Sequence, residues 1–233
     1  MTVDKSPRRI RQMFGEIARR YDFLNHLLSG GMDRWWRRCT VRLAPPDGAV
    51  LDVCTGTADL ALAYWRAGRG RVRVVGADFC RPMLDCGRRK CQRVKAADLD
   101  LVEADAQQLP FADNSFQVVS VAFGLRNLSD PDAGLREMTR VCRPDGRVAV
   151  LEFGMPRARI LRGLYGWYFR RVLPRLGQAL ARNRQEAYNY LPASVGEFPQ
   201  RDALVARMGQ AGLRDVRYHA LTFGIAGLYV GIK

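Results

Sequence analysis

The sequence predicts an α/β protein whose centre is a doubly wound, mostly parallel sheet. From residue 49 to about 153, short apolar runs alternate with helix-like runs, the pattern of a parallel sheet covered by helices. Residues 200–233 then give a helix and two strand-like runs joined by a short loop, and such a closing hairpin places one strand antiparallel in the sheet. The length of 233 residues suits one domain with a full core.

Five strands and three helices are expected in the alternating part of the chain. Each strand is a short run rich in Val, Leu and Ala, and each helix is longer and carries charge on one side. Pro82 suits the first turn of the second helix, and the Pro144–Gly146 turn precedes the fifth strand. The expected strands are 49–54, 72–78, 99–105, 115–124 and 146–153, and the expected helices are 59–68, 81–97 and 131–142.

The C-terminal part completes a seven-stranded sheet. Residues 200–212 have helical periodicity, and 213–221 and 224–233 are strand-like runs separated by a loop that contains Gly224. A loop of that length joins neighbouring antiparallel strands.

Two basic segments lie outside this sheet pattern. Residues 5–42 are basic and contain aromatic residues, and so do residues 156–192, which stand between the fifth strand and the last helix. We therefore expect a helical lead at 1–48 and a sheet domain at 49–233 with a helical insertion at about 156–192. Between Phe153 and Gln185 there is no acidic residue, although arginines alternate with the aromatic run LYGWYF. A solvated helix face usually mixes both signs of charge.

The overall composition limits the partners and the compartment. The net charge of +15 favours binding to phosphates, acidic lipids or nucleic acid. The six cysteines form no CxxC pair and no histidine lies at ligand spacing, so no metal site is expected and the thiols indicate a reducing compartment. No stretch is apolar enough for a signal peptide or a membrane span. We expect a cytoplasmic protein that touches a membrane at most from one side.

The stretch VLDVCTGTAD at 50–59 marks the candidate ligand site, because ligands of open α/β sheets bind at the carboxyl ends of the strands. A dinucleotide fingerprint needs three glycines, whereas only Gly56 is present. Asp52, Asp78 and Asp105 lie in or at the ends of three successive strands. Asp78 stands where an acid binds a ribose diol, in dinucleotide and S-adenosylmethionine sites alike. Three acids favour a positively charged nucleoside such as S-adenosylmethionine, although each acid alone is also typical of a helix cap.

Beyond this loop the chain resembles the class I S-adenosylmethionine methyltransferases, and within them the ubiquinone/menaquinone biosynthesis C-methyltransferases. The resemblance covers nearly the whole chain, and LPFADNSF followed by FGLRN is its most specific part. It is carried by YDFLNHLLSGGMDRWWRR, VLDVCTGTADLA, GADFCRPMLDCGRRK, ADAQQLPFADNSFQVVSVAFGLRN, REMTRVCRPDGRVAVLEF and YNYLPASVGEFPQ. It implies a Rossmann-like class I methyltransferase sheet, S-adenosyl-L-methionine as methyl donor, S-adenosyl-L-homocysteine as product, and a polyprenyl quinol as acceptor.

The same resemblance implies the residues of the site. Arg126 and Tyr21 are the implied catalytic residues, Tyr21 as a pocket wall or hydrogen-bond partner. The family pattern GGTGD differs from this chain at Thr55 and Ala58, and a serine is frequent at the place of Ala122; Thr and Ala tolerate a positive φ poorly. The implied cofactor-binding residues are Asp52, Thr55, Gly56, Thr57, Asp78, Phe79, Asp105, Ala106 and Ala122.

The chemistry of ring-carbon methylation favours Arg126 as a cation near the acceptor. A phenol with a pKa of about 10 is roughly 0.1% ionised at pH 7, so half ionisation requires about 4 kcal/mol. A buried cation can supply that stabilisation. Arg126 follows the fourth strand, where the acceptor should lie. A structural ion pair is the alternative role for Arg126, and apolar packing is the alternative for Tyr21.

Several alternatives stay open. The histidines, His26 and His219, are expected in surface or packing roles. After the fourth strand the chain reads AFGLRN, without the acid or Asn and two prolines common in base N-methyltransferases and without a cysteine nucleophile, which disfavours a nucleic-acid substrate. Methylation of RNA or of a small soluble phenol is one alternative, and a non-catalytic fold relative in a biosynthetic complex is another. The sequence does not set the oligomeric state, and a homo-oligomer is allowed.

The basic insertion has two readings. Arginines among Trp, Tyr, Phe and Leu suit a helix in the head-group region of an anionic membrane, which would place the protein at the inner face of the membrane beside a polyprenyl quinol. Alternatively, the insertion is a helical lid whose arginines are simply solvated.

Overall fold

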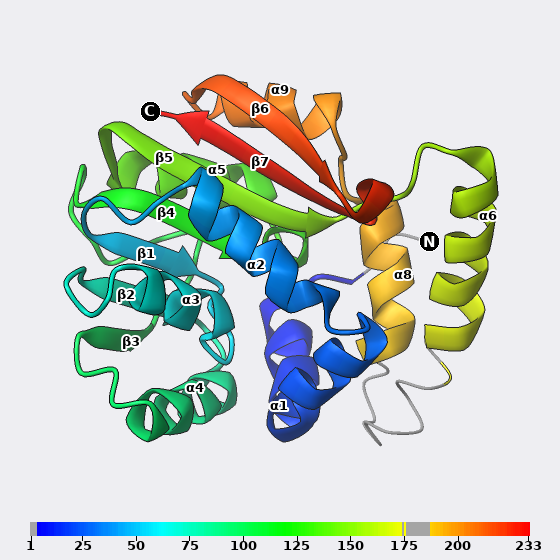
Figure 1. The fold of residues 1–233 in the computed structure, drawn as a ribbon, viewed down its shortest axis with the longest axis horizontal. Helices are drawn as coiled ribbons and strands as arrows, with labels where there is room; N and C mark the ends of the chain where they lie inside the picture. Colours follow the sequence, from blue (N-terminus) through cyan, green and yellow to red (C-terminus); the bar gives the residue numbers. More distant parts are fainter. Residues whose placement is uncertain (1–3, 174, 176–186) are drawn as a thin grey trace.

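A seven-stranded sheet forms the centre of the protein (Figure 1). The computed structural model describes residues 4–173, 175 and 187–233. The strand order is β3-β2-β1-β4-β5-β7-β6. Strand β7 runs antiparallel to both β5 and β6, while β1 to β5 pair in parallel. The doubly wound sheet with its closing hairpin is therefore confirmed. The strands are β1 (Val50–Val53), β2 (Val74–Asp78), β3 (Leu99–Glu103), β4 (Phe116–Ala122), β5 (Cys142–Phe153), β6 (Arg214–Leu221) and β7 (Ala226–Ile232).

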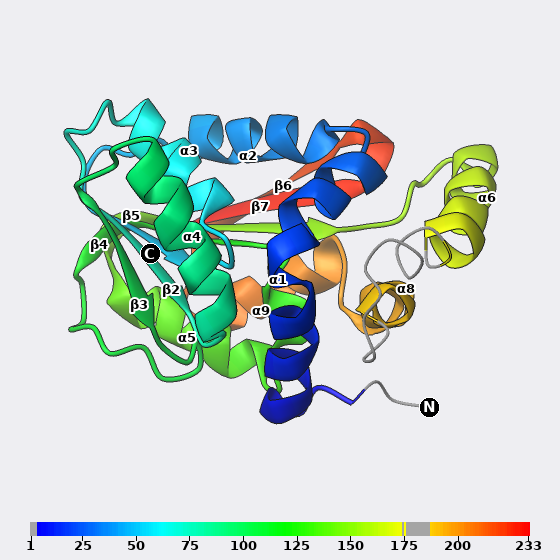
Figure 2. The ribbon, with the colours of Figure 1, turned by 90° about the horizontal axis from the view of Figure 1, so that it is seen from below.

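Helices cover both faces of the sheet. Figure 2 shows α2 (Met32–Leu43) and α3 (Asp59–Ala67) on one side, and α5 (Pro131–Val141) and α9 (Asp202–Gln210) on the other. The helix α4 (Arg81–Arg93) lies beside β2 and β3. It ends before the expected residue 97 because Lys95 takes a left-handed conformation, with φ 56°.

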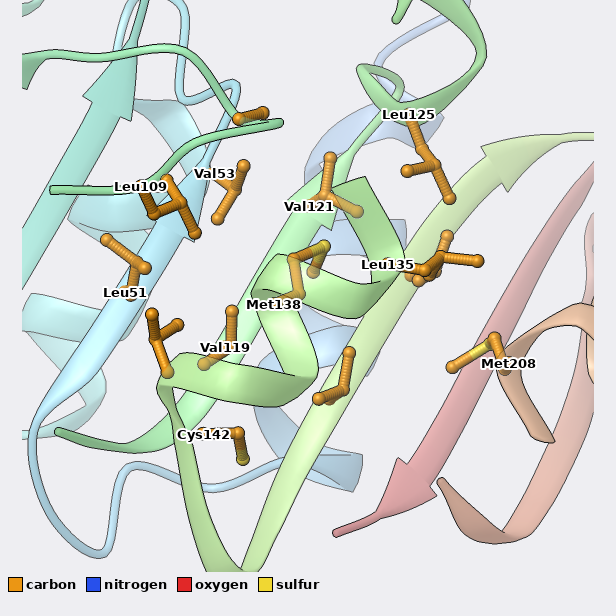
Figure 3. Packing of buried hydrophobic residues seen from close by; sticks show 14 of the residues in the cluster. Leu51, Val53, Leu109, Val119, Val121, Leu125, Leu135, Met138, Cys142 and Met208 are labelled. Carbon is orange, nitrogen blue, oxygen red and sulfur yellow. The ribbon is translucent and has the colours of Figure 1, made fainter. Parts of the chain in front are cut away.

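The alternation of side chains along the strands divides the core into two layers. On β1, Leu51 and Val53 point toward α5, whereas Val50 packs on the side of α2 and α3. Figure 3 shows Leu135 and Met138 of α5 over β4 and β5. These apolar side chains are fully buried, so the parallel strands are held from both faces.

The basic lead and the insertion pack together beyond the carboxyl ends of the strands. Helix α1 (Pro7–Leu28) contributes Ile10, Met13, Ile17 and Leu24 to an apolar cluster with residues of the insertion. The insertion contains α6 (Arg159–Trp167), the π-helical turn η2 (Tyr168–Val172) and α8 (Ala187–Glu197). In both Figure 1 and Figure 2, α6 lies at the end of the molecule away from β3. Among the described residues, no helix combines the length and hydropathy that crossing a bilayer requires.

Candidate active site

The loop after β1 is built around a buried carboxylate. Asp52 is 1% exposed and accepts hydrogen bonds from the Thr55 hydroxyl at 2.7 Å and the Ser120 hydroxyl at 3.0 Å. Burial raises the pKa of Asp52 to about 7, against the lowering effect of these two bonds. Asp52 therefore stabilises the loop through buried hydrogen bonds. It lines neither of the two small cavities described below.

The two residues that depart from the glycine pattern behave differently. Ala58 adopts φ 68°, so the expectation of a strained positive φ is confirmed there, and Gly56 has φ 56°. Thr55 does not have a positive φ, so the expected strain does not arise at this position. Its side chain occupies the space above Gly76, where a Cβ would approach the Thr55 hydroxyl and methyl to 2.9 Å. Because Gly76 on β2 has no side chain, there is room for the side chain of Thr55 on the loop.

Asp78 joins the end of β2 to the same loop. Its carboxylate accepts hydrogen bonds of 2.8 Å from the backbone N–H of Gly56 and of 2.8 Å from that of Cys80. Burial raises the pKa of Asp78 to about 6, although the backbone hydrogen bonds lower it. The carboxylate is thus mostly ionised at neutral pH and fixed in orientation.

Two small cavities flank Asp78 and Phe79. One, of about 50 Å³, is lined also by Gly56 and Ala122, and the other, of about 30 Å³, by Asp105 and Ala106. Ile10 of α1 covers both. Ligand sites usually offer 300 to 1,000 Å³, on the order of ten times more, so a nucleoside needs more room than either cavity has in this structure.

Six of the nine cofactor-binding residues implied by the sequence are brought together at these cavities. Asp52, Thr55 and Thr57 do not line either of them. The Thr57 hydroxyl instead donates to the carboxylate of Asp22 on α1 and accepts from the Lys90 ammonium at 3.1 Å. The remaining set, an ionised Asp78, a second acid in Asp105 and a loop with Gly56 at a positive φ, suits a ligand with hydroxyls and a positive charge. The chemistry of the residues present therefore fits S-adenosylmethionine.

A larger apolar cavity of about 370 Å³ adjoins the first site. Both implied catalytic residues, Tyr21 and Arg126, line it. Phe14, Tyr21 and Phe123 line this cavity and also the 50 Å³ cavity, so they form the wall between the two. The other walls come mainly from further residues of α1, from α2, from the π-helical turn η2 and from α8. The aromatic side chains among them include Trp36, Phe153, Tyr165, Tyr168, Phe169 and Tyr190.

Arg126 is ion-paired within this cavity wall. It lies in the short 3₁₀ turn η1 (Leu125–Asn127) and is 5% exposed. Its guanidinium donates to the Phe123 carbonyl and, at 2.9 Å, to the Glu152 carboxylate. Its Nε is buried and has no hydrogen-bond partner among the residues that the structure describes. Arg126 therefore forms a structural ion pair with Glu152 and also lines the large cavity.

Glu152 is a site residue that the sequence analysis missed. A signal was present, because an acid inside the apolar run VAVLEF is buried and must have a partner. Tyr190 and Asn127 were also missed; the Tyr190 hydroxyl donates to the Asn127 side-chain oxygen at 3.1 Å. Neither residue lies in a run whose pattern predicts this contact.

A chain of charges connects α2 to the start of α3 beside the large cavity. Arg37 pairs with Asp33 and, at 3.6 Å, with Asp59. His26 lies 2.7 Å from Asp33 through its Nδ1. The three residues His26, Asp33 and Asp59 lie close enough to hold a metal ion, but Arg37 already pairs with both acids. His26 belongs to this network through its contact with Asp33, while Asp33 and Arg37 line the cavity.

Comparison with known proteins agrees with this geometry. The family model described as the ubiE/COQ5 methyltransferase family matches residues 1–233. A ubiquinone/menaquinone biosynthesis C-methyltransferase UbiE from Geobacter sp. is 46% identical over 97% of this chain and 96% of that protein. A demethylmenaquinone methyltransferase from Thermus thermophilus is 48% identical over 94% of this chain and 99% of that protein.

Solved structures agree in fold at low sequence identity. A SAM-dependent methyltransferase from Aquifex aeolicus has a TM-score of 0.62 and 16% identity, covering 84% of this chain and 89% of that one. The phosphoethanolamine N-methyltransferase 2 of Haemonchus contortus, in complex with S-adenosyl-L-methionine, has a TM-score of 0.61 and 13% identity, covering 84% of this chain and 52% of that one. With the family model spanning the whole chain, the protein belongs to the ubiE/COQ5 methyltransferase family and is an S-adenosylmethionine-dependent methyltransferase.

Proposed function

We propose that this enzyme methylates a ring carbon of a polyprenyl quinol, with demethylmenaquinol favoured over the ubiquinone-pathway benzoquinol. The observation that carries the proposal is the pair of adjoining sites. An acidic site at Asp78 and an apolar, aromatic cavity of about 370 Å³ share the wall formed by Phe14, Tyr21 and Phe123. The names of the relatives point to the same class of acceptor.

The residues of the chain have separate roles in this proposal. Bound S-adenosylmethionine supplies the electrophilic methyl group. Asp78 accepts hydrogen bonds from ribose hydroxyls, and Gly56 lets the loop backbone approach the ligand. The aromatic cavity binds the quinol ring and excludes water, which strengthens every charge interaction inside it.

Arg126 is the proposed activating residue for the acceptor. Its unpaired Nε is a buried donor, and a buried donor without a partner costs about 1 to 3 kcal/mol. A quinol oxygen in the cavity beside the Arg126 guanidinium would be stabilised as the anion, which makes the neighbouring ring carbon nucleophilic. Tyr21 would hold the ring beside the wall that the methyl group crosses.

Turnover with a reduced short-chain demethylmenaquinone tests this proposal. Arg126→Ala is expected to keep S-adenosylmethionine binding within a few-fold and to lower turnover by at least about 100-fold. Arg136→Ala, at an exposed arginine paired with Asp130, is the matched control and should be near normal. Near-normal turnover of Arg126→Ala would exclude the activating role. Methyl transfer to RNA or to a soluble phenol, without transfer to the quinol, would favour the alternative functions.

We further propose that α6 and the mouth of the large cavity dock on an anionic membrane from the cytoplasmic side. Four large apolar side chains, Leu27, Leu164, Trp167 and Phe223, are between 53% and 76% exposed. Each is adjacent in the chain to a residue that lines the cavity, namely Leu28, Tyr165, Tyr168 and Thr222. These exposed side chains therefore belong to the same segments that form the cavity wall.

The charges on α6 complement an anionic surface. Ile160, Leu164 and Trp167 follow helical spacing on one stripe. Arg157, Arg159 and Arg162 form no ion pair in the described part of the chain. Apolar insertion and about 1 kcal/mol per basic residue near an anionic surface would together hold the helix at the membrane. Arg182 and Arg184 of the basic segment lie outside the described residues.

Vesicle sedimentation tests the docking surface. The wild type should sediment with phosphatidylglycerol-containing vesicles at about 0.1 M salt, where the Debye length is about 10 Å and nearby charges still attract. It should sediment much less with neutral phosphatidylcholine vesicles. Replacing both Leu164 and Trp167 by serine should weaken binding by about tenfold or more, since each apolar side chain contributes about 1.5 to 3 kcal/mol when buried. Val94→Ser, at an exposed apolar residue after α4, is the matched control. Absence of wild-type binding to anionic vesicles would exclude the proposal.

A further inference from the structure

Glu152 is the direct neighbour of Arg126 at the end of β5. Its side chain is 2% exposed. One carboxylate oxygen accepts from the Arg126 backbone N–H at 3.2 Å, and the other accepts from the Arg126 guanidinium at 2.9 Å and from the Phe153 backbone N–H at 3.2 Å. The carboxylate therefore holds both the 3₁₀ turn and the guanidinium of Arg126.

A buried arginine needs such a partner. An isolated buried charge costs several kcal/mol, and the cost is offset only when an opposite charge lies close with good hydrogen-bond geometry. The pairing has a second consequence, because the carboxylate opposes the field of the arginine wherever both charges are at similar distances. The effect of Arg126 on an acceptor then depends on where the acceptor oxygen lies relative to Glu152.

The pKa values of two tyrosines on the cavity wall show how the effects of Arg126 and Glu152 differ with position. For Tyr190, burial raises the pKa to about 12, the charge of Arg126 lowers it and the charge of Glu152 raises it. For Tyr21, burial raises the pKa, the hydrogen bond with Asn25 and the charges of Arg126 and Arg37 lower it, and the opposing charge is that of Asp22 rather than Glu152. Tyr21 also lies on the wall shared with the cofactor site. A phenol on the Tyr21 side therefore experiences the charge of Arg126 with less compensation from Glu152.

We propose that Glu152 is a positioning residue that fixes the Arg126 guanidinium in the cavity wall and offsets its charge, so that the site ionises an acceptor phenol on the Tyr21 side. The unpaired Nε of Arg126 and the three hydrogen bonds of the Glu152 carboxylate are the geometry behind this assignment. The inference rests on the proposed function only for its effect on turnover, since ionisation of a bound phenol does not need methyl transfer.

Three variants measure the opposing effects of the two charges. The probe is 1-naphthol bound to the protein, whose absorbance reports its ionisation as the pH is raised. Because the phenol is expected on the Tyr21 side, Glu152→Gln should lower the pKa of bound naphthol by less than one pH unit, and Arg126→Gln should raise it by about one unit or more. The Arg126→Gln, Glu152→Gln double variant should lie between the two. The acid limb of the kcat/KM profile with the quinol should move in the same directions.

A purely structural role for Glu152 predicts a different result. Loss of structure lowers activity in both single variants and moves both naphthol pKa values in one direction. That outcome, or an unchanged naphthol pKa in Glu152→Gln, overturns the proposal. If the quinol is not turned over at all, the naphthol titration still decides the role of Glu152, so failure of the proposed function is distinguishable.

Two further variants guard the interpretation. Glu137 also pairs with an arginine, but this partner, Arg140, lines none of the three cavities at the site, whereas Arg126 lines the large one; Glu137→Gln should leave the naphthol pKa unchanged. If Glu152→Gln does not fold, Glu152→Asp keeps the charge but withdraws it by one methylene. It should lower the naphthol pKa by less than one unit, and a rise in this variant overturns the proposal.

Discussion

The hydroxyl of Thr55 donates a 2.7 Å hydrogen bond to the carboxylate of Asp52, and the same side chain fills the space above Gly76. The threonine thereby satisfies a buried acid of the first strand. Thr55 stands where the family pattern has a glycine, and in this chain its side chain helps to hold the loop after β1 in place.

Replacing Thr55 should therefore destabilise the protein. Thr55→Gly removes the hydrogen bond and adds the conformational entropy of glycine, so the free energy of unfolding should fall by about 1 to 3 kcal/mol. Thr55→Ser keeps the hydroxyl and loses one methyl group, which should cost about 1 kcal/mol. Urea unfolding at pH 8 measures both. A Thr55→Gly variant as stable as the wild type would contradict the role of this bond.

Asp52 should make stability depend on pH in an unusual direction. Its folded pKa of about 7 lies above the unfolded value of 3.8. Between these values the native state holds a proton that the unfolded state has released, so this residue reduces stability as the pH rises from about 4 to 7. The difference of about 3 units corresponds to about 4 kcal/mol at most. Asp52→Asn removes the titration, so the variant should gain stability relative to the wild type with rising pH.

Urea unfolding of both proteins at pH 4.5, 6 and 8 checks this prediction, and other titrating groups cancel in the difference. Asp100→Asn, at an exposed acid on β3, is the control and should show a nearly constant difference. A difference between wild type and Asp52→Asn that does not change with pH would show that Asp52 titrates near its ordinary value.

Ala58 should tolerate glycine but not a β-branched residue. An L-residue at φ 68° costs roughly 1 to 2 kcal/mol, and Ala58→Gly removes this strain while losing a buried methyl group that contributes about 1 kcal/mol. The net change in unfolding free energy should be within about 1 kcal/mol. Ala58→Val should lose at least about 2 kcal/mol, because valine tolerates this φ poorly and the site is fully buried. Thermal unfolding compares the variants, and equal stability of Ala58→Val and wild type would contradict the strain.

The sequence predicts the fold and the place of the site because both depend on local patterns. Alternating apolar runs predict the parallel sheet, and the acids at the strand ends predict where Asp78 and Asp105 meet. Partners far apart in the chain are not encoded in such patterns. The sequence places Arg126 directly after β4, whatever the order of the strands in the sheet. Its pairing with Glu152, however, depends on β5 lying beside β4 and on the conformation of the turn η1. The same holds for Thr57, whose partner Asp22 belongs to α1.

Asp78 should make cofactor binding weaken in acid. Its pKa of about 6 in the protein is raised by burial, and a carboxylate that accepts ribose hydroxyls must be ionised. Protons therefore compete with the ligand, and the dissociation constant of S-adenosylmethionine should rise about tenfold per pH unit below 6 and stay constant above 7. Asp78→Asn should weaken binding about 10- to 100-fold at pH 8 and flatten the profile. Calorimetric titration from pH 5 to 8 measures this, and a wild-type affinity that is constant over the range would exclude the role of Asp78.

Helix α1 should control how fast the cofactor enters and leaves. Asp22 of α1 pairs with Lys90 of α4 at 2.8 Å and accepts from the Thr57 hydroxyl, so it fastens α1 to the loop after β1. The cavities beneath α1 measure about 30 and 50 Å³, too little for a nucleoside unless this contact opens. Asp22→Asn weakens the contact in the closed form, and the open form becomes more populated.

Stopped-flow fluorescence with S-adenosylhomocysteine measures the consequence. Asp22→Asn should raise both the association and the dissociation rate several-fold, because a partly exposed charge pair contributes up to about 1 kcal/mol. Salt should raise both rates in the wild type by screening the same pair. Asp85→Asn, on α4 beside Arg81 and Arg88, is the matched control and should leave both rates near wild type. Rates in Asp22→Asn within twofold of the wild type would mean that another contact limits the opening of α1, and the apolar cluster around Ile10 and Phe169 would then be the next element to test.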